Sequence, residues 1–250
     1  MRVIGIISGK GGVGKTTTSV NLGGALNYFG EDVTVVDANF TAPDISVLLG
    51  FPKLGLNLKS VLSGKCGVND ALYAHSSGTK LLPTSLSLAE LNIDGSNLSN
   101  VVRRLDSEIV LVDSCAGFEK DFFHVLNAVD EVLIVCNSDL LSATNALKAV
   151  NLAKQYGKKV LGLVLNRYDG TGMSAKAIEN LIGVNVIGLV PEDQYIKKAL
   201  DEKDMVVYLE PEADASIAFK KLAADLIGRD YKIPEVKNSR LGDFLRFIGL

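Results

Sequence analysis

The sequence has 250 residues and contains no tryptophan, only three cysteines and only two histidines. Cys66, Cys115 and Cys136 are unevenly spaced and form no C-x-x-C pair. This spacing argues against a disulfide framework and against a zinc site, and it fits buried thiols in a reducing cytoplasm. No apolar run approaches the roughly 18 residues that cross a bilayer. The first residues enter an apolar strand directly, so we expect neither a transmembrane helix nor a signal peptide.

An excess of positive charge is also lacking. The formal net charge is −3 and the isoelectric point is about 5.5, so no overall basic field attracts nucleic acid. Hydrophobic residues make up 47% of the chain and charged residues 22%. This balance is typical of a globular protein with enough apolar mass for one large α/β domain or two small ones.

Short apolar runs alternate with segments of helical periodicity, which is typical of parallel strands joined by crossover helices. The runs are rich in valine, isoleucine and leucine and do not alternate with polar residues, as expected for strands covered on both faces. We therefore predict an α/β fold, a mostly parallel twisted sheet of seven or eight strands between two layers of helices. The predicted strands are residues 3–8, 33–37, 80–83, 109–113, 131–136, 160–166 and 186–191. The predicted helices include residues 16–29, 67–74, 98–105, 140–156, 174–181, 195–201 and 213–227.

The pattern changes after Gly228. Residues 1–228 are predicted to form one domain, and residues 229–239 are polar, contain Pro234 and are predicted to be a linker. A short amphipathic stretch, residues 240–250, ends the chain.

Residues 9–16 read Gly-Lys-Gly-Gly-Val-Gly-Lys-Thr and lie directly between the first predicted strand and the first predicted helix. Glycines at this position let the backbone curl so that several N–H groups point inward, toward phosphate oxygens. Lys15 is then expected to reach the β- and γ-phosphates, and the Thr16 hydroxyl to bind Mg²⁺. The helix N-terminus adds a positive dipole. The residues expected to bind nucleotide here are Gly11, Gly12, Val13, Gly14, Lys15, Thr16 and Thr17.

Two further strands end in acids at the same expected edge of the sheet. Asp37 follows Val33-Thr34-Val35-Val36, and Asp113 follows Ile109-Val110-Leu111-Val112. An acid at the end of a buried apolar strand is costly unless it has a partner. Mg²⁺ bound with ATP or ADP provides one, so Asp37 and Asp113 join Thr16 as the predicted metal-site residues. The alternative is that each acid caps the following helix.

A second lysine in the loop, Lys10, makes the string resemble the deviant phosphate loop of the MinD/ParA family of ATPases. That resemblance implies the P-loop NTPase fold and an ATP-dependent homodimer in which Lys10 contacts phosphate bound to the partner subunit. It implies catalytic roles for Lys10, Lys15, Asp37 and the residue at position 39. The segment Asp113-Ser114-Cys115-Ala116-Gly117 resembles the Asp-Ser-Pro-Ala-Gly switch of MinD-type proteins, with cysteine in place of proline.

Position 39 departs from the family pattern Asp-x-Asp, because the chain has Asp37-Ala38-Asn39. The second acid of that pattern is expected to orient the attacking water, and an amide can hydrogen-bond water but cannot take its proton. Asp44 stands where the family commonly has asparagine, so an acid lies nearby, five residues displaced. The hypothesis is normal ATP binding with slow or partner-dependent hydrolysis, in which case Asn39→Asp raises turnover.

The adenine end is marked by the strand end Leu163-Val164-Leu165-Asn166 and by the Pro191-Glu192-Asp193 loop. In the family, these segments lie against the base, so the resemblance implies adenine contacts for Asn166, Pro191 and Asp193. Asparagine at a strand end is also a common turn former, which is the alternative interpretation.

In the tail, Leu241, Phe244, Leu245 and Ile248 share one face of a helix, with Phe247 beside it. Eleven residues are too few for a stable helix in water, so the segment needs a surface. Its position and pattern are similar to the C-terminal membrane-targeting helix of MinD, with arginines meeting anionic headgroups. Docking on its own domain or on a partner protein is the alternative.

The leading hypothesis is a MinD-like ATPase that cycles between the cytoplasm and the inner face of the cell membrane and organises cell division or another spatial process. An unidentified activating protein is an expected partner, and DNA is not. A ParA-type DNA-partitioning ATPase remains an alternative, as does an ATP-binding scaffold with little turnover because of Asn39. A metal-cluster carrier of related fold needs paired cysteines, which the sequence lacks.

Overall fold

The computed structural model describes residues 1–51, 54–86 and 94–233, and these residues contain one eight-stranded sheet. The strand order is β3-β4-β2-β5-β1-β6-β7-β8. All neighbours are parallel except β3, which runs antiparallel to β4. The strands are β1 (Arg2–Ile7), β2 (Val33–Ala38), β3 (Tyr73–Ala74), β4 (Lys80–Leu82), β5 (Ile109–Ser114), β6 (Glu131–Cys136), β7 (Lys159–Tyr168) and β8 (Val186–Pro191).

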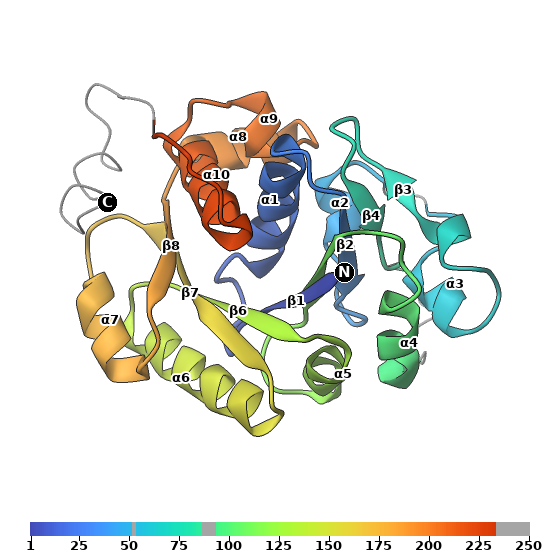
Figure 1. The fold of residues 1–250 in the computed structure, drawn as a ribbon, viewed down its shortest axis with the longest axis horizontal. Helices are drawn as coiled ribbons and strands as arrows, with labels where there is room; N and C mark the ends of the chain where they lie inside the picture. The colour runs from blue at the N-terminus through green and yellow to red at the C-terminus, as the bar shows by residue number, and fades with distance from the viewer. Residues whose placement is uncertain (52–53, 87–93, 234–250) are drawn as a thin grey trace.

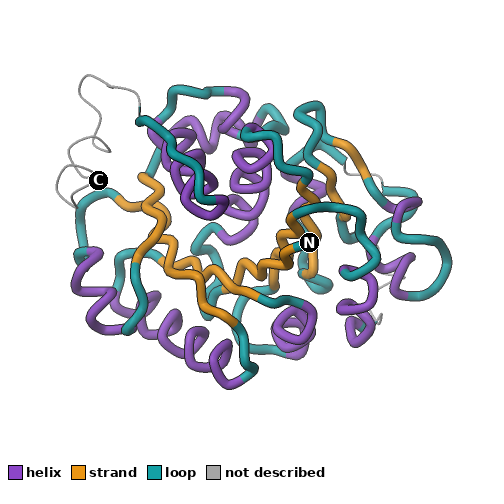
Figure 2. Tube along the Cα trace, in the orientation of Figure 1, coloured by secondary structure: helices purple, strands orange, loops and turns teal. Residues whose placement is uncertain are grey.

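Helices cover both faces of the sheet, so the predicted three-layer α/β fold is confirmed (Figures 1 and 2). Helices α1 and α10 lie together on one face, and α5, α6 and α7 lie on the other (Figure 1). The helices of the described residues are α1 (Lys15–Tyr28), α2 (Ile45–Leu48), α3 (Leu58–Leu62), α4 (Leu98–Val102), α5 (Lys120–Ala128), α6 (Leu140–Gln155), α7 (Ala175–Ile182), α8 (Gln194–Asp201), α9 (Val206–Leu209) and α10 (Asp214–Ile227).

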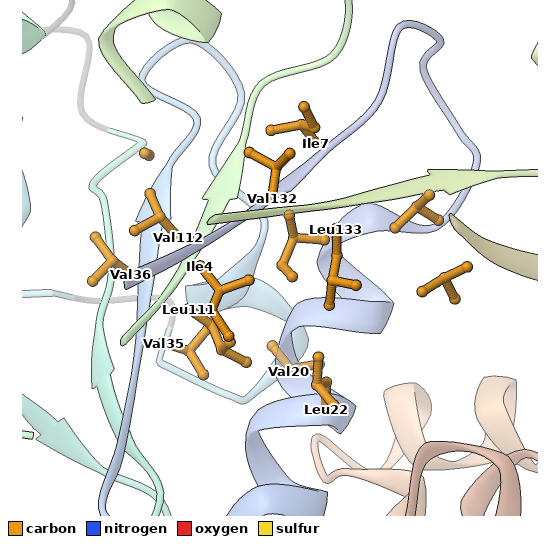
Figure 3. Close-up of a cluster of buried hydrophobic side chains, with 14 of the residues drawn as sticks. Ile4, Ile7, Val20, Leu22, Val35, Val36, Leu111, Val112, Val132 and Leu133 are labelled. Atoms are coloured by element: carbon orange, nitrogen blue, oxygen red, sulfur yellow. The ribbon is translucent and has the colours of Figure 1, made fainter. Parts of the chain in front are cut away.

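The central strands are buried on both faces, which explains why their sequences lack alternation. Ile4, Val35 and Leu111 point to the face that carries α1, whereas Val36 and Val112 point to the opposite face (Figure 3). Each is 1% exposed or less. Burying one such side chain stabilises the fold by about 1.5–3 kcal/mol, so these strands hold their carboxyl ends at fixed positions.

One predicted helix was wrong, and one observed helix was not predicted. Residues 67–74, predicted to be helical, form a short 3₁₀ turn (Asn69–Ala71) followed by β3. The Asp70 carboxylate accepts a hydrogen bond from the backbone N–H of Gly67, which favours a turn over a helix. Conversely, α5 was not predicted, although Phe122, Val125 and Leu126 recur at helical spacing and are fully buried.

The start of the predicted linker contacts the domain. The Arg229 guanidinium donates to the backbone carbonyl of Phe29 at 2.5 Å and pairs with Glu31 at 3.2 Å. The Tyr231 ring packs edge-on against Phe29, with centroids 5.8 Å apart. Residues 234–250, which include the predicted tail, lie outside the described residues. Among the described residues, no helix combines the length and apolarity needed to cross a bilayer.

Candidate nucleotide-binding site

The glycine-rich loop leaves the carboxyl end of β1 and runs into α1, as its sequence predicts. Gly14 has φ 92°, and a Cβ at this position would lie 2.0 Å from Nδ2 of Asn166. Only glycine fits here, because other residues are strained at positive φ and have no room for a side chain. Helix α1 begins without a side-chain cap and without an acid in its first turn, so its N–H groups are available to an anion.

Lys15 lies at the base of this loop and is 7% exposed. Burial lowers the pKa of Lys15, and the nearby carboxylates of Asp113 and Asp44 act in the opposite direction. Lys15 and Thr16 line one cavity together with Gly12, Gly14 and Thr17. A buried cation among glycine N–H groups is suited to phosphate oxygens.

Asp37 and Asp113 stand side by side on β2 and β5, where the register pairs them directly. Asp37 is fully buried and Asp113 is 1% exposed. Burial raises the pKa of Asp37 well above its usual value, and the charge of Asp113 adds to the effect. Burial also raises the pKa of Asp113 to about 6. Two adjacent buried carboxylates are therefore costly when both are ionised.

One oxygen of Asp113 is positioned for a cation. Its Oδ1 accepts a hydrogen bond from Ser19 Oγ at 2.9 Å, whereas its Oδ2 is buried without a partner. Mg²⁺ prefers such hard oxygen ligands and typically takes one or two carboxylates together with phosphate oxygens and water. In the part of the chain that the structure describes, no cluster of three or more His, Cys, Asp or Glu side chains forms a metal site by itself. The unpartnered oxygen of Asp113 thus fits a metal ion that arrives with nucleotide, whereas both oxygens of Asp37 already accept backbone hydrogen bonds.

A second cavity adjoins the phosphate cavity and is suited to the base. Thr17, Asn166 and Arg167 line it together with Glu192 and Asp193. The Asn166 amide donates to the Val13 carbonyl at 2.7 Å, and its Oδ1 is buried without a partner. Asn166 therefore braces the phosphate loop and leaves one acceptor, which suits an exocyclic amino group.

The other predicted base contacts have structural partners. Asp193 accepts hydrogen bonds from the backbone N–H groups of Tyr195 at 2.9 Å and Ala215 at 3.0 Å, so it caps α8 and fixes α10. Pro191 is buried at the end of β8. Arg167 was not predicted. It has φ 53°, pairs with Glu192 at 4.0 Å and lines both cavities.

Comparison with known proteins identifies this arrangement. Residues 4–206 match the CobQ/CobB/MinD/ParA nucleotide-binding domain. The chain belongs to this family. It is a P-loop ATPase of the MinD/ParA type, similar to MinD, and the predicted resemblance is confirmed.

Three relatives illustrate the similarity. The uncharacterized ATP-binding protein MJ0547 of Methanocaldococcus jannaschii is 33% identical over 250 residues, covering 97% of this chain and 95% of the relative. The cell division ATPase MinD of Pyrococcus furiosus superimposes with a TM-score of 0.87 at 32% identity, covering 91% of this chain and 98% of that one. The septum site-determining protein MinD of Pyrococcus horikoshii, solved in complex with Mg-ADP, superimposes with a TM-score of 0.86 at 29% identity. The match covers 90% of this chain and 95% of that one.

The segment that resembles the MinD switch begins with Asp113 and ends with Gly117. Gly117 has φ 79°, and a Cβ at this position would meet no atom within 4 Å, so glycine serves the backbone conformation and not close packing. Burial raises the pKa of Cys115 to about 11, so its thiol is protonated at neutral pH. Lys15 and the backbone N–H of Phe122 act to lower this pKa, but burial outweighs them, so Cys115 is not activated as a nucleophile.

Lys10, the second lysine of the MinD/ParA-type loop, points to α6 in this single chain. Its ammonium lies 3.4 Å from Oδ1 of Asp139, and both side chains are more than one-third exposed. Asp139 also accepts from the backbone N–H of Ser142 at 2.8 Å, which caps α6. Leu140 and Leu141 follow and are 64% and 62% exposed. The structure therefore adds Asp139 and two exposed leucines to the neighbourhood of the loop.

Proposed function

We propose that this chain is a MinD-like ATPase that binds ATP with Mg²⁺, dimerises and associates reversibly with the inner face of the cell membrane. In this cycle it organises cell division or another spatially positioned process, and hydrolysis is slow or stimulated by an unidentified protein. The observation that carries the proposal is the pair of adjacent buried carboxylates, one of which, Asp113, lies near Lys15. Asp37 and Asp113 are unfavourable as neighbours, and Oδ2 of Asp113 has no partner.

Each residue of the site has a definite task in hydrolysis. The N–H groups of residues 11–17 and the ammonium of Lys15 hold the β- and γ-phosphates and neutralise the charge that develops during transfer. Asp37, Asp113 and Thr16 would hold Mg²⁺, which would contribute further charge neutralisation on the phosphates. Asn166 leaves its Oδ1 for the adenine amino group, and Pro191 and Asp193 shape the loop beside the base.

The homodimer is supported by the surface beside the loop. Leu140 and Leu141 are adjacent exposed apolar side chains next to the Lys10–Asp139 pair. Adjacent exposed leucines beside an ion pair are typical of a surface that another molecule covers. A second copy of the chain that binds this surface places its own Lys10 at the nucleotide of the first copy. The exposed Lys10–Asp139 ion pair is broken when this happens.

Dimerisation is therefore expected to depend on this pair of leucines. Leu140→Glu and Leu141→Glu together are expected to weaken the ATP-bound dimer at least tenfold, or about 1.4 kcal/mol, because two carboxylates replace apolar contact area. Light scattering of the full chain with a non-hydrolysable ATP analogue measures the effect. Leu181→Glu, which changes an exposed leucine of α7, is the matched control. A dimer dissociation constant equal to that of the control contradicts the proposal that Leu140 and Leu141 lie in the dimer interface.

Membrane association is tested by co-sedimentation with anionic liposomes and, separately, with plasmid DNA, each with ATP and with ADP. We expect pelleting with liposomes only in ATP, and we expect it to be lost when residues 240–250 are removed. A single short amphipathic helix binds weakly, so two tails in a dimer bind far more tightly. Phe244→Asp places a charge on the apolar face of the tail and is expected to reduce this pelleting as the deletion does. Pelleting with DNA and not with liposomes supports the ParA-type alternative and rejects the membrane cycle.

A further inference from the structure

Asp44 is an acid on the wall of the phosphate cavity. It lines that cavity together with Lys15, Thr16 and Asn39. The carboxylate and the Lys15 ammonium are close enough for each to affect the pKa of the other. Asp44 is exposed, so water reaches it, whereas Asn39 is half-buried. The cavity thus contains a solvent-accessible carboxylate beside the lysine that holds the phosphates.

Asn39 is occupied by its own loop. Its Oδ1 accepts a hydrogen bond from the backbone N–H of Ala42 at 3.1 Å, and its Nδ2 donates to the carbonyl of the same residue. Both ends of the amide therefore close one turn. A side chain committed in this way holds the loop and is not free to orient a water molecule.

The same loop fixes the backbone at Asp44. Asp37 Oδ1 accepts from the N–H of Asn39 at 3.1 Å, and its Oδ2 accepts from the N–H of Ile45 at 3.1 Å. One buried carboxylate thereby ties both ends of the segment, and Ile45 directly follows Asp44. The position of Asp44 relative to the phosphate loop is therefore set by a residue of the predicted metal site.

The Asp44 side chain itself remains available. Asp44 precedes α2, and its carbonyl accepts from the N–H groups of Val47 and Leu48 at 3.1 and 2.9 Å. Its carboxylate does not cap that helix. Within residues 1–51, 54–86 and 94–233 it has no hydrogen-bond partner. An anchored backbone with an uncommitted carboxylate is a suitable arrangement for a group that must bind water.

We propose that Asp44 is the catalytic carboxylate that orients the attacking water, the task that the family pattern assigns to position 39. The water oxygen forms the new bond to the γ-phosphorus, and the bond from that phosphorus to the β–γ bridging oxygen breaks. The electron pair of the broken bond stays on ADP. A proton of the water passes to Asp44 and from there to the released phosphate. The inference rests on the proposed function, since it concerns hydrolysis at the same site.

The test is single-turnover hydrolysis of radiolabelled ATP by the full chain with Mg²⁺ and anionic liposomes. Asp44→Asn is expected to lower the rate by about 10²–10³-fold, while the Kd for ATP changes less than threefold. Contrary to the expectation from the sequence, Asn39→Asp is expected not to raise the rate, because it removes the donor to the Ala42 carbonyl. Asp201→Asn, an exposed acid at the end of α8, is the matched control.

Either of two results overturns the assignment. One is an Asp44→Asn rate within twofold of the wild-type rate, and the other is an Asn39→Asp rate at least tenfold above it. A wild-type chain that binds ATP and never hydrolyses it also overturns the assignment. Failure of the proposed function is seen separately, as liposome pelleting that does not depend on ATP. In the supporting case Asp44→Asn pellets with ATP as the wild type does and remains bound longer.

Discussion

Replacing Lys15 by methionine is expected to weaken ATP binding by about 10²–10³-fold and to abolish hydrolysis. Methionine keeps the length of the side chain and removes its charge. Truncating one partner of a buried charge pair typically costs 2–5 kcal/mol, and Lys15 is 7% exposed at the base of the loop. Its ammonium is also the cation placed to neutralise charge that develops on the γ-phosphate.

Fluorescence titration with a labelled ATP analogue measures this loss, and thermal unfolding without nucleotide shows whether the fold survives. We expect the variant to unfold at or above the wild-type temperature, because burial disfavours the charged form of Lys15 and lowers its pKa. Lys176→Met is the matched control, since Lys176 is 80% exposed on α7. An ATP Kd for the Lys15 variant within threefold of the wild-type value is incompatible with the assigned role.

Replacing Asp113 by asparagine is expected to stabilise the nucleotide-free protein at neutral pH while reducing Mg²⁺-dependent hydrolysis at least 10²-fold. The pKa of Asp113 is about 6 in the folded chain, against an ordinary value of 3.8. The folded state therefore binds more protons than the unfolded state between these two values. Stability falls as pH rises through that window and stays reduced above about pH 6.

The size of this effect is on the order of 3 kcal/mol, since each pKa unit corresponds to about 1.4 kcal/mol, or roughly 6–12 °C in melting temperature for a chain of this length. Thermal unfolding from pH 4 to pH 8 measures it, with Asp201→Asn as the control. We expect the gain of the Asp113 variant to shrink as pH falls to 4, because the wild-type carboxyl is then protonated. A gain that is equal at pH 4 and pH 7.5 contradicts the electrostatic explanation.

Saturating ATP with Mg²⁺ is expected to reduce the pH dependence of the wild-type chain, because the cation relieves the repulsion between Asp37 and Asp113. The unpartnered Oδ2 of Asp113 gives this expectation its physical basis. Stabilisation by a ligand that binds only the folded state grows with the logarithm of its concentration. Melting temperatures measured over one series of ATP–Mg²⁺ concentrations at pH 5 and pH 7.5 therefore separate stabilisation by binding from relief of the repulsion between the two carboxylates.

The fold could be predicted from the sequence wherever a pattern lies within consecutive residues. Apolar runs without alternation predicted β1, β2 and β5, because both faces of these strands are buried. The same reasoning failed for residues 67–74, where the hydrogen bond from the Gly67 N–H to the Asp70 carboxylate outweighs helical spacing. It also missed α5, whose nine residues lie between the switch segment and β6.

By itself, the sequence determined the phosphate loop, its strand and its helix, and it placed Asp37 and Asp113 at strand ends. These features follow from local chemistry, since glycine permits positive φ and parallel strands deliver their carboxyl ends to one edge. Only the tertiary structure decided which side chains meet. Lys10 reaches Asp139 across 129 residues, Asn166 braces Val13 across 153, and the Asn39 amide closes a turn beside an uncommitted Asp44. Such contacts depend on strand order and loop closure, which residue spacing along the chain does not encode.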